Sequence, residues 1–298
     1  MFAALISRNL KCINCYATTK FRSFSDVGPV KMSYTVYGEN NTRNLPLFIM
    51  HGLLGSQRNW RALAKALEAR TDKMIYTVDA RNHGDSPHTS DLISAHMVMD
   101  AVELMKDRGI KKVCVMGHSM GGRTMMHFAL KHPELVDRAI IIDMSPITLP
   151  QDFHLLEEIC KAMESINIPA KYSLSEGRKL AEDQVKDSVG ALVTVQYLIM
   201  NLKKRENGEF YWMPNLKVIC KDFGLFKKFK DDIKYLPPYK GPVMFICGTQ
   251  SNFIELSTWP DIQRMFPNAE IHWLDAGHLV HFDQPENFLD LVVEFLKR

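Results

Sequence analysis

The sequence predicts an α/β fold in which a mostly parallel β-sheet is flanked by helices and carries an inserted helical cap. Three observations predict it: short apolar runs alternate with longer amphipathic segments, one long interval breaks that alternation, and 298 residues suit an α/β fold of this kind. Hydrophobic residues make up 46% of the chain and charged residues 24%, a composition that excludes a disordered chain or a disulfide scaffold. No apolar run reaches the roughly 18 residues of a membrane-spanning helix.

Seven short apolar segments are the expected strands. Most are continuous runs of aliphatic or β-branched residues that end in a turn, which is typical of strands buried on both faces of a parallel sheet. In chain order they are Lys31–Tyr37, Leu45–Met50, Met74–Asp79, Val113–Met116, Ala139–Asp143, Val243–Cys247 and Glu270–Leu274.

Amphipathic segments between these runs are the expected helices: Trp60–Arg70, Ile93–Arg108 and Gly121–His132. A last helix, Pro285–Lys297, begins with Pro-Glu and ends with Lys-Arg, as the helix dipole favours. Strands that alternate with helices in this way indicate an open α/β sheet.

Residues 148–239, called the insertion below, contain helical patterns but no clear strand. A crossover helix needs far fewer than ninety residues, so a helical cap is favoured over a set of ordinary crossovers. The expected core is then residues 25–147 together with 240–298. Residues 189–200 of the insertion are rich in Leu, Val, Ile and Met, which suits either an acyl-chain pocket or a helix that packs one face on the core.

Residues 1–24 have the composition of a mitochondrial transit peptide. They contain four basic and no acidic residues, so the rest of the chain has a formal net charge of −1 against +3 for the whole. The string Arg22-Ser23-Phe24 resembles a matrix processing site. We therefore expect a mitochondrial, matrix location, and the near-neutral remainder argues against a nucleic-acid partner.

The string VCVMGHSMGG, residues 113–122, predicts a nucleophilic serine. A strand, a G-x-S-x-G turn and a helix in succession form a nucleophile elbow, which holds the Ser119 hydroxyl exposed above the sheet. The backbone N–H of Met120 would then be one donor to an oxyanion. The turn in FIMHGLLGS, residues 48–56, would supply the second donor from Leu53.

A general base is expected in LDAGHLVHFDQP, residues 274–285, between the last strand and the last helix. His278 follows the serine in chain order, as a base in this arrangement should, and its Gly-His step on a loop favours it over His281. The pair has no carboxylate at metal-ligand spacing, so neither a metal nor another cofactor is predicted.

HGLLGS, VDARNHGDSP, GHSMGG and DAGH occur in the order and spacing of the α/β-hydrolase superfamily, which the chain resembles from residue 30 onward. The strings at 81–87 and 143–146 resemble a mitochondrial branch of serine hydrolases and small bacterial esterases. That resemblance implies an α/β-hydrolase fold, hydrolysis of lipid esters including diacylglycerol, and association with the 2-oxoglutarate dehydrogenase complex.

The acid that orients the histidine is not fixed by the sequence. Most superfamily members carry it in G-x-x-D, where this chain reads Gly248-Thr249-Gln250-Ser251. Asp143 is preferred because several family members place the acid after that strand, with Glu255 as the alternative and Asp222 more distant. Ser251 is then an auxiliary partner.

The sequence therefore predicts a serine esterase or lipase that works through an acyl-enzyme on a small-molecule acyl ester or lipid. A serine nucleophile excludes the epoxide hydrolases and dehalogenases of this fold, which use aspartate. Two alternatives stay open: a non-catalytic protein that binds a mitochondrial partner complex, and a perhydrolase, which the long insertion disfavours.

Overall fold

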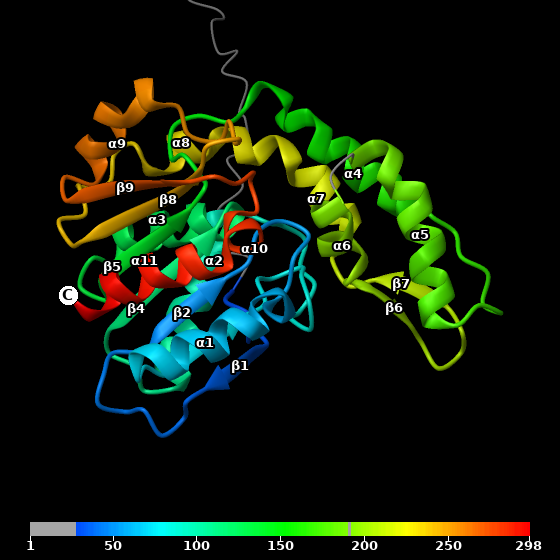
Figure 1. Ribbon diagram of the computed structural model, residues 1–298, viewed down its shortest axis with the longest axis horizontal. Coiled ribbons are helices and arrows are strands. Elements are labelled where there is room, and N and C mark those ends of the chain that lie inside the picture. The colour runs from blue at the N-terminus through cyan, green and yellow to red at the C-terminus, as the bar shows by residue number, and fades with distance from the viewer. Residues whose placement is uncertain (1–27, 190–191) are drawn as a thin grey trace, which may run out of the picture.

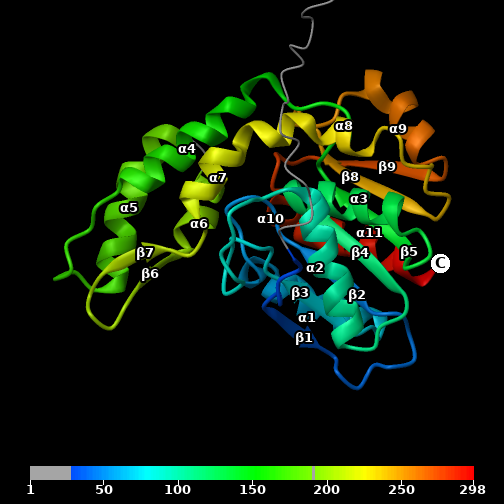
Figure 2. The same cartoon turned by 180° about the vertical axis from the view of Figure 1, so that it is seen from behind.

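The computed structural model describes residues 28–189 and 192–298, which form three layers with a β-sheet between two layers of helices (Figures 1 and 2). The described part of the sheet has seven strands in the order β1-β3-β2-β4-β5-β8-β9. β1 is antiparallel to β3 and all other neighbours are parallel. The strands are β1 Tyr34–Tyr37, β2 Leu47–Met50, β3 Ile75–Val78, β4 Val113–His118, β5 Val136–Ile142, β8 Val243–Gly248 and β9 Ala269–Leu274.

Alternate residues of these strands pack on opposite faces of the sheet. Leu47 and Ile49 of β2 join a core with α1 (Arg61–Thr71) and α11 (Pro285–Lys297), the two helices in front of the sheet in Figure 1. Phe48 and Met50 join the larger core on the other face, with α2 (Ser94–Asp107), α3 (Met120–Lys131) and α9 (Trp259–Met265). Figure 2 shows α2 and α3 in front. Both faces are thus covered, which is why the central strands read as continuous apolar runs.

All seven expected strands and all four expected helices are present, with ends that shift by up to three residues. β1 begins at Tyr34 rather than Lys31 because the preceding backbone is held by side chains: Ser33 N–H donates to Ser86 Oγ (2.8 Å). No described helix is both long enough and apolar enough to cross a membrane.

The insertion lies between β5 and β8 and projects from the sheet (Figures 1 and 2). Its helices are α4 His154–Ser165, α5 Leu174–Val189, α6 Leu192–Ile199, α7 Leu216–Asp222 and α8 Phe229–Ile233. It has a small core of its own, formed by Ile168, Ala181, Val195, Ile199 and Leu202.

The insertion also contains a hairpin that the sequence pattern did not predict. β6 (Leu202–Lys204) pairs antiparallel with β7 (Phe210–Trp212). Three-residue strands are too short to show an alternating pattern, so the hairpin had no detectable signal. Trp212 Nε1–H donates to Met163 O (2.8 Å), which ties the hairpin to α4.

Candidate active site

Ser119 lies between β4 and α3 in a conformation that few residues adopt. Its φ is 53° and its ψ is −115°, a combination that costs a non-glycine residue on the order of 1–3 kcal/mol. The two glycines of the motif make the turn possible. A Cβ on Gly117 would lie 2.3 Å from the Gly121 carbonyl, and one on Gly121 would lie 2.4 Å from Met50 O. The geometry is that of a nucleophile elbow.

The neighbouring strand β5 ends beside this elbow. Ser119 N–H donates to Ile142 O (3.1 Å), so the next residue, Asp143, follows its strand at the same edge of the sheet as Ser119. Asp143 also has a positive φ, 47°. The turn after β2 lies on the other side: a Cβ on Gly52 would lie 3.3 Å from Ser119 Cβ. Three strand ends therefore converge on the serine.

Asp143 and His278 form a hydrogen-bonded pair in which the aspartate is buried and the histidine is half-buried. The distance from His278 Nδ1 to Asp143 Oδ2 is 2.6 Å, and the Asp143 side chain is 1% exposed against 27% for His278. Asp143 Oδ1 accepts from Gly248 N–H (3.1 Å), and Ser251 Oγ donates to Oδ2. A carboxylate that accepts from three donors is held in one orientation and can fix both the ring and the tautomer of the histidine.

The other candidates lie elsewhere. Glu255 is exposed, and its carboxylate accepts from Ser257 (3.3 Å). Asp222 of α7 accepts from Leu92 N–H (2.9 Å). His281 is buried and stacked on Trp60, with ring centroids 4.3 Å apart. Burial lowers the pKa of His281 to about 3, so this ring is a neutral packing group at physiological pH.

Two further residues, neither of which the sequence analysis singled out, hold the His278 loop. Phe253 stacks on the His278 ring, with centroids 3.7 Å apart and an interplanar angle of 13°. His118 donates from Nε2 to His278 O (2.9 Å) and so ties this loop to the residue that precedes Ser119. Burial lowers the pKa of His118 well below its usual value, which keeps the ring neutral. His118 is part of the elbow motif, but nothing in the sequence indicated its hydrogen-bond partner, His278 O.

The loop that carries Leu53 is fixed by two neutral histidines. His51 Nε2 accepts from Ala80 N–H (3.1 Å), which leaves the proton on Nδ1 for Gly52 O (2.7 Å). His83 Nε2 accepts from Leu54 N–H (3.1 Å). Burial lowers the pKa of His51 to about 4 and that of His83 to about 3, so both keep these roles near neutral pH.

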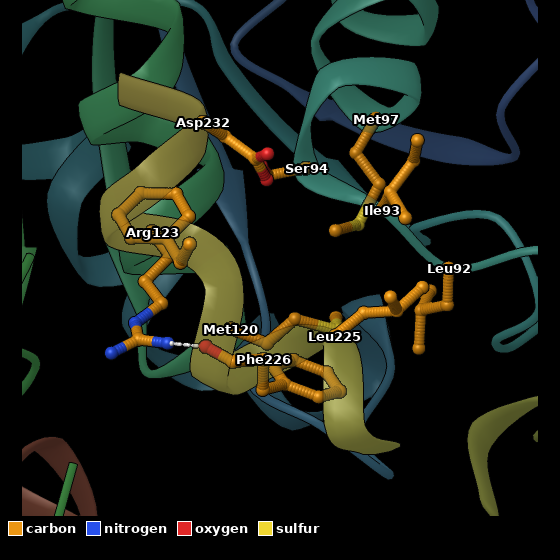
Figure 3. A pocket seen from close by; sticks show the side chains of 10 residues that line it. Leu92, Ile93, Ser94, Met97, Met120, Arg123, Leu225, Phe226 and Asp232 are labelled. Carbon is orange, nitrogen blue, oxygen red and sulfur yellow. Dashed lines mark hydrogen bonds between the residues drawn. The ribbon is translucent and has the colours of Figure 1, made fainter. Parts of the chain in front are cut away.

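A cavity of about 20 Å³ lies next to Met120, the residue after Ser119 (Figure 3). Figure 3 shows side chains from the start of α2 facing Leu225 and Phe226, which precede α8. Most of the lining is apolar: Leu92, Ile93, Met97, Met120, Leu225 and Phe226. Arg123 closes one side, where its guanidinium donates to the carbonyl oxygens of Phe226 and Thr148. Met120 therefore links the elbow to an apolar cluster of side chains.

The fold and this arrangement define the class of protein. A family model described as the alpha/beta hydrolase fold matches residues 46–285. The chain belongs to this family.

Particular relatives narrow the class. The sn-1-specific diacylglycerol lipase ABHD11 of Mus musculus is 36% identical over 284 residues, which cover 95% of this chain and 90% of the relative. The Danio rerio protein of the same name is 36% identical over 282 residues, 92% of this chain and 85% of the relative. A solved structure titled marine microorganism esterase has a TM-score of 0.80 and 31% identity, covering 89% of this chain and 99% of its own. The chain is accordingly a hydrolase that acts on esters, and the expected family resemblance is confirmed.

Proposed function

We propose that the protein hydrolyses lipid acyl esters, diacylglycerol among them, with Ser119 as nucleophile, His278 as general base and Asp143 as the orienting acid. The observation that carries this proposal is the 2.6 Å pair of His278 and Asp143 beside a serine held at positive φ. A carboxylate, an imidazole and a hydroxyl in this order are what acyl transfer at neutral pH requires.

In the first half-reaction, Ser119 Oγ attacks the acyl carbon while His278 Nε2 takes the hydroxyl proton. The negative charge that develops on the carbonyl oxygen is stabilised by the N–H groups of Leu53 and Met120. The intermediate collapses when the C–O bond to the alcohol breaks and the His278 proton passes to the departing oxygen. Water, deprotonated by the same nitrogen, then releases the carboxylic acid and restores Ser119.

The choice of lipid esters is supported by the relatives named sn-1-specific diacylglycerol lipase ABHD11 and by the apolar side chains that meet beside Met120. These side chains enclose only about 20 Å³, so an acyl chain enters there only when they move apart. If the acyl chain occupies this cavity, Leu225→Trp narrows it and lowers kcat/KM for octanoyl esters at least tenfold more than for butyryl esters. Leu256→Trp, at an exposed site, is the matched control. Equal effects of Leu225→Trp on both esters would place the acyl chain elsewhere.

A matrix location is proposed on the composition of residues 1–24, which lie outside the described residues. Import of the full chain into isolated mitochondria, with loss of about 24 residues, tests it. Association with the 2-oxoglutarate dehydrogenase complex is proposed on the family resemblance alone, and co-purification of the two from mitochondria tests it.

The decisive experiment compares the full chain with Ser119→Ala for labelling by a fluorophosphonate probe and for hydrolysis of a diacylglycerol. Loss of labelling, with a fall of about 10³–10⁶ in turnover, is expected because Ser119 is the nucleophile. Ser257→Ala, which removes an exposed hydroxyl, should keep both the labelling and the hydrolysis. Retained hydrolysis in a folded Ser119→Ala protein would refute the mechanism. If Ser119→Ala loses hydrolysis and still binds its mitochondrial partner complex, the partner-binding alternative is favoured.

A further inference from the structure

The direction of the Leu53 N–H is set by the peptide that joins Gly52 to Leu53. In a planar trans peptide the carbonyl oxygen and the N–H point in opposite directions, so whatever holds the Gly52 oxygen also aims the Leu53 N–H. The Gly52 oxygen accepts three hydrogen bonds. Two come from the same loop, from His51 Nδ1 (2.7 Å) and from Gly55 N–H (3.0 Å), and the third comes from the hydroxyl of Tyr197 (3.2 Å), 145 residues away.

Tyr197 reaches this peptide from helix α6 of the insertion. Its side chain is buried, and burial raises the pKa of its phenol, so the hydroxyl is a neutral donor. The loop is shaped to receive it: a Cβ on Gly55 would lie 1.8 Å from the Tyr197 hydroxyl oxygen. Only a glycine leaves room for the phenol at this point.

A second side chain from the same part of the insertion holds the next carbonyl of the loop. Asn201, just after α6, donates from Nδ2 to Leu54 O (2.6 Å). Asn201 is also buried. The insertion thus fixes the carbonyls on both sides of the peptide that links Leu53 to Leu54, and Leu54 itself has a positive φ of 60°.

We infer that Tyr197 and Asn201 are positioning residues of the ester hydrolase, which hold the 52–55 loop so that the Leu53 N–H faces the oxyanion. The inference rests on the proposed function, because it gives Leu53 the role of a donor in the transition state. It assigns the insertion a part in the chemical step: without the Tyr197 hydroxyl, the Gly52 oxygen keeps its two donors from the loop, His51 Nδ1 and Gly55 N–H, and loses the one that ties the Gly52–Leu53 peptide to the insertion. A rotated peptide would present a carbonyl, rather than an N–H, to the developing negative charge.

Tyr197→Phe tests the inference with little change of shape. Loss of a whole oxyanion donor lowers kcat by about 10²–10³, so looser orientation of one donor should lower kcat for a soluble p-nitrophenyl ester by about tenfold. KM should stay within about twofold, because the donor acts on the transition state rather than on the bound ester. The rate of phosphonylation by a fluorophosphonate probe should fall by a similar factor.

The chain offers a closely matched control. The hydroxyl of Tyr239 is also buried and donates to a backbone carbonyl, Val136 O, at the same 3.2 Å. Val136 begins β5, at the opposite edge of the sheet from Ser119. Tyr239→Phe should therefore lower the thermal midpoint about as much as Tyr197→Phe and leave kcat unchanged.

Asn201→Asp is the second variant, since it replaces the donor to Leu54 O with an acceptor of the same shape. It should lower kcat at unchanged KM in the same way. The inference is overturned if folded Tyr197→Phe and Asn201→Asp keep the wild-type kcat. It is also overturned if Tyr197→Phe and Tyr239→Phe lose kcat equally, in both cases while Ser119→Ala stays inactive. Activity in Ser119→Ala would instead overturn the proposed function, so the two failures are distinguishable.

Discussion

Replacement of Asp143 by Asn is the most direct test of the catalytic arrangement, because it keeps the shape of the side chain and changes what its atoms donate and accept. The carboxylate accepts from Gly248 N–H, Ser251 Oγ and His278 Nδ1. An amide has one oxygen and one NH₂ group. If the oxygen stays on Gly248 N–H, the NH₂ group faces His278 Nδ1 and selects the tautomer that carries its proton on Nε2.

That tautomer cannot take the Ser119 proton, because Nε2 no longer has a free lone pair. The opposite orientation of the amide places an N–H donor against Gly248 N–H, so neither orientation satisfies the site. A triad with the wrong histidine tautomer loses about 10⁴ in kcat, and we expect Asp143→Asn to lower kcat/KM by about 10³–10⁴. At about 1.36 kcal/mol for each factor of ten, this is a loss of about 4–5 kcal/mol of transition-state stabilisation.

Steady-state hydrolysis of a p-nitrophenyl ester measures the loss, with the thermal midpoint as the check on folding. Glu255→Gln is the matched control, since Glu255 is an exposed carboxylate on the nearby loop. It should keep full activity. Our reasoning is refuted if folded Asp143→Asn keeps more than a tenth of wild-type kcat/KM, or if Glu255→Gln loses as much as Asp143→Asn.

Three further predictions concern the surroundings of this pair. Ser251→Ala should lower kcat/KM about tenfold, because a hydrogen bond to a charged group contributes about 1.5–3 kcal/mol; a change below twofold in ester hydrolysis would contradict this. Gly121→Ala should lower the unfolding free energy by more than about 3 kcal/mol in urea titrations, since its Cβ would lie 2.4 Å from Met50 O. Gly224→Ala, where a Cβ meets nothing within 4 Å, should change it by less than about 0.5 kcal/mol. Stability should also fall with acid, because burial lowers the pKa of five histidines: to about 4 for His51 and His127, to about 3 for His83 and His281, and well below its usual value for His118. Below pH 6.5 the histidines of the unfolded chain bind protons that these buried rings do not bind. Each ring therefore lowers the free energy of unfolding by on the order of 2 kcal/mol at pH 5 and leaves it unchanged above pH 7. Equal urea midpoints at pH 7 and pH 5 would contradict the assignment of these rings as neutral and buried.

The strands and the elbow were predictable because their signals are local. A strand buried on both faces must be a continuous apolar run, and Gly117, Ser119 and Gly121 lie within five residues of one another. The hairpin β6–β7 was not predictable, since its three-residue strands are held by pairing with each other and by Trp212 on α4. Local patterns indicate elements that are long enough to repeat a period, and they miss shorter ones.

The residues that support the site were hidden for a different reason. Tyr197 and His118 act through single hydrogen bonds to backbone carbonyls that lie 145 and 160 residues away. A carbonyl is present at every position, so such a bond leaves no partner residue type in the sequence. Phe253 likewise acts by stacking on His278, and an aromatic residue on a loop has no signature of that role.

The acid is the intermediate case, because the sequence favoured Asp143, which follows strand β5, but left Glu255 open as an alternative. β5 and β8 are neighbours, and their ends are joined by hydrogen bonds from Asp143 N–H to Ile246 O (2.9 Å) and from Gly248 N–H to Asp143 Oδ1. A carboxylate after either strand would therefore lie near His278. Two would not be tolerated together: Ser251 Oγ contacts the Asp143 oxygen that also faces His278, and a second carboxylate there would repel the first and raise the pKa of one of them. A hydroxyl at position 251 supplies a donor instead. An aspartate at position 143 thus explains why position 251, where most superfamily members carry the acid, is a serine in this chain.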